Sequence, residues 1–77
     1  MTLTIYSKPN CMQCNFTKRF LKDKGIEFIE KDITVSEEAL QEVKDLGFQS
    51  VPVVKNSDGE AFAGFNPERL ESLIHKA

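Results

Sequence analysis

Two cysteines, Cys11 and Cys14, are the residues of this chain whose type and spacing most clearly permit chemistry. They flank Met12-Gln13 where a strand-like run gives way to a helix-like run, so they lie about one helical turn apart. Two thiols at this separation can close a disulfide with little backbone movement. Because the closed loop is too short to constrain the unfolded chain much, the pair is a poor structural staple. We therefore interpret it as a reactive pair.

The position of each thiol predicts its role in thiol–disulfide exchange. The nucleophile in this reaction is a thiolate. Cys11 precedes the first helical turn, where free N–H groups and the positive end of the helix dipole favour an anion. We expect Cys11 to attack a substrate disulfide and Cys14, one turn inside the helix, to resolve the mixed disulfide. Such a protein carries two electrons per cycle, and Met12 and Gln13 help to set its redox potential.

Half of a zinc site is the alternative interpretation of the same pair. Zinc sites usually take four ligands, whereas the chain has two cysteines and one histidine, His75. Nothing places His75 near the pair, and we interpret it as a solvated residue near a helix end. We expect redox chemistry with no metal and no cofactor. A binding module in which Cys11 and Cys14 capture a metal or iron–sulfur cluster between two chains stays open.

Length and charge limit the classes of function. The 77 residues predict a single domain, 1–77, with a modest core. The formal net charge of −2 argues against nucleic-acid binding, which normally needs a basic excess. No apolar run approaches the roughly 18 residues of a membrane span, and the amino terminus lacks a signal-peptide pattern. We therefore expect a cytoplasmic protein without membrane association, and in a reducing compartment such a cysteine pair is more often catalytic than structural.

The first half of the chain reads as strand, helix, strand. Residues 2–7 alternate as a half-buried strand, residues 12–24 form a helix that ends at Gly25, and residues 27–33 form a second strand. At helical spacing, the inward-facing residues are Phe16, Phe20 and Leu21. The residues expected to face water are Lys18, Arg19, Lys22 and Lys24. Because a helix of about 13 residues joins the two strands, we expect them to be parallel, with a right-handed crossover.

The second half adds a helix, a hairpin and a last helix. The helix starts after Thr34 or Ser36, the hairpin pairs residues 51–55 with 60–63, and Asn66 caps the last helix. The two apolar stripes consist of Ala39, Leu40, Val43 and Leu46, and of Leu70, Leu73, Ile74 and Ala77. The order β-α-β-α-β-β-α predicts an α/β fold, a four-stranded mixed sheet flanked by three helices. With the cysteine pair at the first strand-to-helix junction, it indicates a thioredoxin-like fold.

The dipeptide Val51-Pro52 is the second feature with functional meaning. Only about 5% of X-Pro bonds are cis in general, so a turn proline is the plain interpretation. A cis bond at this place would leave the Val51 backbone exposed beside Cys11, ready to pair with a substrate chain. In this fold context we expect the bond to be cis.

Three motifs together resemble the glutaredoxin branch of the thioredoxin superfamily, over essentially the whole chain. They are the cysteine pair after the first strand, Val51-Pro52 before the third, and the Gly64 junction before the last helix. The resemblance implies a cis proline at Pro52 and a basic residue at Lys8. Two features depart from typical glutaredoxins. Met12-Gln13 replaces Pro-Tyr, and residues 64–68 lack the Gly-Gly segment and the acidic pair that bind glutathione.

These departures are similar to the NrdH-redoxins, a glutaredoxin-like group. Their pair is usually Cys-(Met/Val)-Gln-Cys, and their segment Trp-Ser-Gly-Phe-Arg-Pro aligns with residues 62–67. Gly64, Phe65 and Pro67 match it, while Phe62, Ala63 and Asn66 replace Trp, Ser and Arg. The resemblance implies an electron donor for class Ib ribonucleotide reductase that thioredoxin reductase reduces. A glutathione-dependent glutaredoxin is the alternative.

The residues expected to contact partners gather around the cysteine pair. Phe65 lies in the break before the last helix and is a candidate docking residue, whereas core packing is the alternative for Phe65 and Phe62. The basic run of the first helix is usually only a solvated face. We expect a monomer whose partners are thioredoxin reductase and the large subunit of class Ib ribonucleotide reductase. The contacts are expected from Lys8, Met12, Gln13, Val51, Pro52, Gly64 and Phe65.

Overall fold

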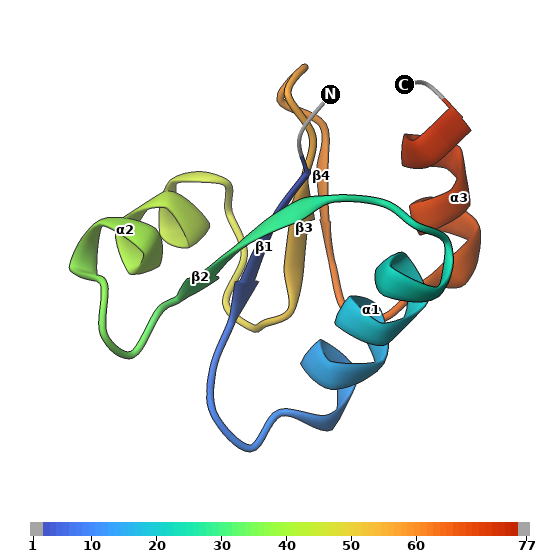
Figure 1. The fold of residues 1–77 in the computed structure, drawn as a ribbon. Coiled ribbons are helices and arrows are strands. Elements are labelled where there is room, and N and C mark those ends of the chain that lie inside the picture. The colour runs from blue at the N-terminus through green and yellow to red at the C-terminus, as the bar shows by residue number, and fades with distance from the viewer. Residues whose placement is uncertain (1–2, 76–77) are drawn as a thin grey trace.

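The computed structural model describes residues 3–75, with side chains through residue 74. Its elements follow the predicted order (Figure 1): β1 (Leu3–Ser7), α1 (Met12–Asp23), β2 (Phe28–Asp32), α2 (Glu37–Asp45), β3 (Val53–Lys55), β4 (Ala61–Ala63) and α3 (Pro67–His75). The predictions for Thr2, for Ala77 and for the side chain of His75 lie outside the described part of the chain.

The four strands form one mixed sheet in the order β2-β1-β3-β4. β1 runs parallel to β2, with Leu3 opposite Phe28 and Ser7 opposite Asp32, because α1 carries the chain back between them. β3 runs antiparallel to both β1 and β4. Helices α1 and α3 cover one face of the sheet, and α2 covers the other (Figure 1). The predicted four-stranded mixed sheet with three flanking helices is confirmed.

β1 is a central strand that is buried on both faces, so the expectation of a half-buried strand was wrong. Side chains alternate along a strand, and Ile5 and Tyr6 therefore point to opposite faces. Ile5 belongs to the core cluster that contains residues of α1 and α3, whereas Tyr6 belongs to the cluster that contains residues of α2. The short alternating pattern of one strand could not show that a helix covers its second face.

Side-chain caps decide where two helices begin. Ser36 accepts a hydrogen bond at 3.2 Å from an N–H of the first turn of α2. Thr34 instead donates its hydroxyl and its N–H to Asp32 Oδ1. Of the two predicted caps, Ser36 is therefore the one that the chain uses. Asn66 accepts a hydrogen bond at 3.2 Å from the N–H three residues on and caps α3, as predicted.

Candidate functional site: a disulfide at a helix N-terminus

The loop between β1 and α1 places the first cysteine at the start of the helix. Asn10 has a φ of 61°, a left-handed conformation that asparagine adopts more readily than most residues. The chain then brings Cys11, in an extended conformation with φ −105° and ψ 108°, to the N-cap position of α1. Cys11 thus precedes the helix and Cys14 lies in its first turn, as the sequence predicted.

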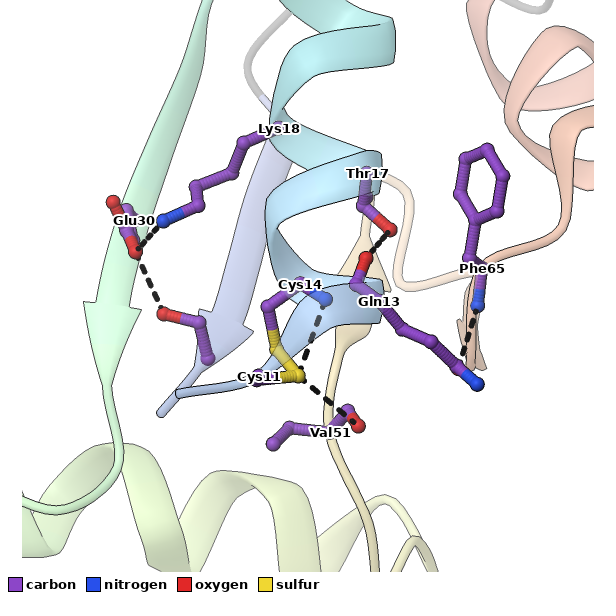
Figure 2. Close-up of a disulfide and its surroundings, with 9 residues drawn as sticks. Cys11, Gln13, Cys14, Thr17, Lys18, Glu30, Val51 and Phe65 are labelled. Carbon is purple, nitrogen blue, oxygen red and sulfur yellow. Dashed lines mark hydrogen bonds and ion pairs between the residues drawn. A yellow bond between two sulfur atoms is a disulfide. The ribbon is translucent and has the colours of Figure 1, made fainter. Parts of the chain in front are cut away.

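Cys11 and Cys14 are joined in a disulfide, with their Cα atoms 5.2 Å apart (Figure 2). This Cα separation is one that disulfides commonly have. The Cys14 N–H donates a hydrogen bond to Cys11 Sγ at 3.1 Å. After reduction, an N–H in this place and the helix dipole favour a thiolate at Cys11. Cys11 is 9% exposed and Cys14 is 1% exposed, so Cys11 is the more accessible sulfur.

The Val51–Pro52 peptide bond is cis, as predicted. Pro52 is buried, and the carbonyl oxygen of the half-buried Val51 lies 4.0 Å from Cys11 Sγ (Figure 2). β3 begins only at Val53, since Pro52 has no N–H to offer a neighbouring strand. The main chain of Val51 therefore lies beside the sulfur of Cys11.

Gly64 and Phe65 connect two parts of this site through consecutive N–H groups. The Gly64 N–H donates to the Pro52 carbonyl oxygen at 2.8 Å. The Phe65 N–H donates to Gln13 Oε1 at 3.4 Å (Figure 2). Gly64 has a φ of 87°, in the left-handed region that favours glycine. The segment before α3 is thus attached both to the Pro52 loop and to the loop that the cysteines close.

Lys8 and Met12 lie in the same region but have exposed side chains. Met12 is 71% exposed between the two cysteines. Lys8 is exposed in the loop before Cys11, and its side chain forms no ion pair with the residues that the structure describes. Both side chains are therefore accessible to a second protein.

The inner face of α1 differs from the prediction. Phe16 was expected to face inward, but it is 49% exposed, and the helix instead buries Cys14, Thr17 and Leu21. The Thr17 hydroxyl donates to the Gln13 carbonyl oxygen at 2.9 Å, which satisfies this polar group in the core. The pattern of apolar residues misplaced this face because a polar residue, Thr17, occupies part of it.

As a result, three aromatic rings line an open hollow between α1 and the segment before α3. The Phe65 ring centroid lies 5.9 Å from that of Phe16 and 6.2 Å from that of Phe20. Arg19 and Asp23 complete the lining of the hollow. Phe65 is half-buried and also packs against the core cluster on this side of the sheet. Phe65 was a predicted docking residue, whereas the hollow that it forms with Phe16 and Phe20 was not predicted.

Phe62 is buried in that same core cluster, so the core-packing interpretation holds for this residue.

A charged cluster that was not predicted joins α1 to the sheet. The buried Ser7 hydroxyl donates to Glu30 Oε2 at 2.8 Å, and Lys18 Nζ lies 2.8 Å from the same oxygen (Figure 2). The hydrogen bond from Lys18, followed by that from Ser7, holds the pKa of Glu30 below its ordinary value. Lys18 was expected to face water only. It is half-buried because it reaches across to β2, a contact that the helix sequence alone does not encode.

The described residues offer neither a metal cluster nor a membrane-spanning helix. In this part of the chain, no three His, Cys, Asp or Glu side chains are grouped so that they could hold a metal ion. No helix within residues 3–75 is long and apolar enough to cross a membrane. The ligand set that one chain offers at the site is two thiols, which form a disulfide here and are fewer than the four ligands of a structural zinc site.

Known proteins resemble this chain in both sequence and structure. The sequence model of the glutaredoxin family matches residues 3–60. The glutaredoxin-like protein NrdH of Lactococcus lactis subsp. cremoris (strain MG1363) is 41% identical over 71 residues, which cover 92% of this chain and 97% of that protein.

Solved structures extend the comparison to the whole fold. The NrdH-redoxin from Escherichia coli matches with a TM-score of 0.88 at 33% identity, covering 95% of each chain. The thioredoxin-like protein BC3987 matches with a TM-score of 0.85 at 33% identity, covering 92% of this chain and 97% of its own. These matches confirm the predicted thioredoxin-like fold. The chain therefore belongs to the glutaredoxin family, as a glutaredoxin-like thiol–disulfide oxidoreductase of the NrdH type with a redox-active cysteine pair.

Proposed function

We propose that this protein is a cytoplasmic dithiol electron carrier that reduces class Ib ribonucleotide reductase and is itself reduced by thioredoxin reductase. The observation that carries the choice of reductant is that the polar groups of residues 65 and 66 are already hydrogen-bonded within the chain. The Phe65 N–H bonds to Gln13, and the Asn66 side chain caps α3. These groups are already engaged within the chain, and residues 64–68 hold one glycine and no acidic pair. Both facts favour a protein dithiol over glutathione as the reductant.

Cys11 is the nucleophile in this proposal. Its thiolate attacks one sulfur of the target disulfide, a new S–S bond forms, and the second target sulfur leaves as a thiolate. Cys14 then attacks Cys11 Sγ, which forms the Cys11–Cys14 disulfide and releases the target with both of its thiols. Two electrons pass to the target, which also takes up two protons. The lower exposure of Cys14 keeps it from competing with Cys11 for the first attack.

The main chain of Val51 orients the target chain. A target cysteine that reaches Cys11 Sγ comes close to the Val51 carbonyl oxygen, which lies 4.0 Å from that sulfur. An extended target segment can then pair with this main chain in the manner of an added strand. Lys8, Met12 and Phe65 surround the contact and supply side-chain interactions with the partner.

The similarity to known proteins supports the same choice. The Lactococcus lactis and Escherichia coli proteins are both described as NrdH. The Escherichia coli NrdH-redoxin is further described as having a thioredoxin-like activity profile. By similarity, we infer thioredoxin reductase as the electron source for this chain. The target, class Ib ribonucleotide reductase, follows from the resemblance of residues 11–14 and 62–67 to the NrdH-redoxins.

Turnover with two reducing systems tests this proposal. One contains NADPH and thioredoxin reductase, and the other contains NADPH, glutathione and glutathione reductase, each with the class Ib large subunit as the acceptor. We expect efficient turnover only with thioredoxin reductase, and a Cys11→Ser control should be inactive in both systems. Efficient reduction by glutathione alone would overturn the choice of reductant. Reduction by thioredoxin reductase without transfer to the large subunit would overturn the choice of target.

A further inference from the structure

Gln13 lies between the cysteines, yet both ends of the residue are engaged within the chain. Its Oε1 accepts the Phe65 N–H at 3.4 Å, and a Cβ atom placed on Gly64 would lie 3.8 Å from the same oxygen. Its carbonyl oxygen accepts the Thr17 hydroxyl at 2.9 Å. Figure 2 shows the Gln13 side chain extending away from the disulfide toward Phe65.

We propose that Gln13 is a positioning residue that connects the redox state of the Cys11–Cys14 pair to the Gly64–Phe65 segment. The inference rests on the proposed function in one respect, since an electron carrier must be recognised by its reductase when oxidised and by its target when reduced. A segment whose conformation follows the redox state of the pair provides a physical basis for that discrimination.

The covalent step acts directly on the loop that contains Gln13. In the oxidised protein the disulfide closes a four-residue loop and holds the Cα atoms of Cys11 and Cys14 5.2 Å apart. Reduction by a dithiol breaks this S–S bond, delivers two electrons and two protons to the pair, and leaves the reductant as a disulfide. The two sulfur atoms are then non-bonded neighbours, which van der Waals contact keeps about 3.5 Å or more apart. The backbone or side chains of the loop must adjust, and Gln13 lies within it.

Phe65 is the residue that responds to such an adjustment. Its hydrogen bond to Gln13 is exposed and longer than most N–H···O bonds, so a small displacement of the acceptor breaks it. The neighbouring N–H stays bonded to Pro52 at 2.8 Å. Phe65 also contributes its ring to the hollow that Phe16 and Phe20 line. Loss of the Gln13 acceptor therefore changes the aromatic surface that Phe65 forms with Phe16 and Phe20.

Amide hydrogen exchange of the full chain, followed by NMR, tests the connection. The protein is compared oxidised and after reduction with dithiothreitol. In the oxidised state, Gln13→Leu removes the acceptor, and the Phe65 amide should exchange about two- to tenfold faster, the range expected for one hydrogen bond. Gln13→Glu keeps an acceptor oxygen and should restore slow exchange. Reduction should speed Phe65 exchange in the wild type and have little effect in Gln13→Leu.

Internal controls separate this effect from a general loosening of the protein. The Gly64 amide, which bonds to Pro52, should exchange equally in every variant and state. Met12→Leu changes the neighbouring residue of the same loop and should leave Phe65 exchange as in the wild type. Equal Phe65 exchange in the oxidised and reduced wild type, or in the wild type and Gln13→Leu, would overturn the inference.

Steady-state kinetics supply a second readout. The KM of thioredoxin reductase for the oxidised protein should rise about two- to fivefold in Gln13→Leu with kcat unchanged, because one weak hydrogen bond shapes the docking surface. Gln13→Glu should restore the KM. Gln41→Leu makes the same chemical change on α2 and should leave the KM unchanged. If the reductase does not reduce the wild type, the proposed function fails, while amide exchange still decides whether Gln13 acts as proposed.

Discussion

At the scale of single residues, two identical thiols differ because the helix places them differently. Cys11 stands ahead of the first turn with 9% of its surface exposed, while Cys14 is covered and directs its N–H to the Cys11 sulfur. An incoming disulfide therefore meets Cys11, and an anion at Cys11 receives the support of the helix N-terminus. Cys14 needs only to reach its neighbour one turn away.

This difference predicts opposite outcomes for two serine variants. Cys14→Ser keeps the attacking thiol but loses the resolving one, so a mixed disulfide between Cys11 and the target should accumulate. Cys11→Ser should form no mixed disulfide, and its turnover should fall to the background rate. Non-reducing electrophoresis and mass spectrometry measure the mixed disulfide in both variants. The wild type is the control, in which little mixed disulfide should accumulate. A Cys11→Ser protein that reduced disulfides at the normal rate would show that the roles are wrongly assigned.

Glu30 predicts a pH-dependent contribution to stability. Lys18 and Ser7 hold its folded-state pKa below the ordinary value, to which the pKa returns in the unfolded chain. Between these two pKa values the unfolded state binds more protons than the folded state. The stabilisation is therefore present above the unfolded pKa and is lost as the pH falls through the folded pKa. Its size is small, because the Glu30 side chain is 41% exposed and solvent screens the ion pair.

Urea unfolding measures this contribution. We expect Glu30→Gln to be less stable than the wild type at pH 7, and we expect the difference to shrink as the pH falls through the folded-state pKa of Glu30. Glu27→Gln is a matched control, because Glu27 is exposed just before β2 and forms no ion pair with the described residues. A difference between the wild type and Glu30→Gln that stayed constant from neutral to strongly acidic pH would contradict the electrostatic origin.

At the scale of elements, the junction between β4 and α3 holds the site together. Its Gly64 N–H bonds to Pro52 and its Phe65 N–H bonds to Gln13, so one short segment is attached to both loops that flank the disulfide. The first of these bonds needs a backbone that turns with a positive φ, which glycine adopts without steric cost. The cap at Asn66 then starts α3 directly after the junction.

Two glycine variants separate backbone strain from function. Gly64 and Gly59 have similar φ angles of 87° and 91°, so alanine at either position should cost about 1–2 kcal/mol of stability. Gly64→Ala should also lower turnover, because a shifted Gly64 backbone disturbs its N–H bond to the carbonyl of Pro52, the residue after Val51, whose own carbonyl lies beside Cys11 Sγ. Gly59→Ala, in the turn before β4, should keep turnover at the wild-type level. Denaturant unfolding and the reductase assay measure the two effects, and equal turnover losses would mean that strain alone is responsible.

At the scale of the whole molecule, the sheet brings together parts of the site that are distant in the chain. β3 lies directly beside β1 in the sheet, which sets the Val51–Pro52 loop next to the end of β1 and the cysteines that follow it. α1 and α3 share one face (Figure 1), and this shared face lets Phe65 meet Phe16 and Phe20. The result is one cysteine pair in which Cys11 is the sulfur that reaches the surface.

A single accessible pair predicts a fixed stoichiometry. Each molecule of oxidised protein should consume one NADPH in the presence of thioredoxin reductase, because one disulfide takes up two electrons. The ratio should not depend on protein concentration, and light scattering should give the mass of a monomer. The controls are Cys11→Ser, which should consume none, and an iron assay of the purified protein. A dimer with bound iron and little NADPH consumption would instead indicate a module that captures a cluster between two chains.

The sequence was sufficient for the features that neighbouring residues encode. The cysteine pair, its place at a helix start, the element order and the Asn66 cap all follow from spacing and turn chemistry within a few residues. The cis bond at Pro52 was predicted because the expected fold implies a cis proline at this position, and the structure contains it. The other features could be predicted because each depends on local backbone geometry, whereas the cis bond was predicted from the expected fold.

Tertiary structure alone decided what depends on contacts between distant segments. It turned Phe16 outward and placed Thr17 inward, where the Thr17 hydroxyl donates to the Gln13 carbonyl oxygen. It buried β1 on both faces and joined Lys18 to Glu30 across the crossover. It also aimed Gln13, 52 residues away in the chain, at the N–H of Phe65. The motif Cys11-Met12-Gln13-Cys14 thus indicated the chemistry by itself. The packing of α1 against the segment before α3 decided which aromatic surface the protein presents beside that motif's helix.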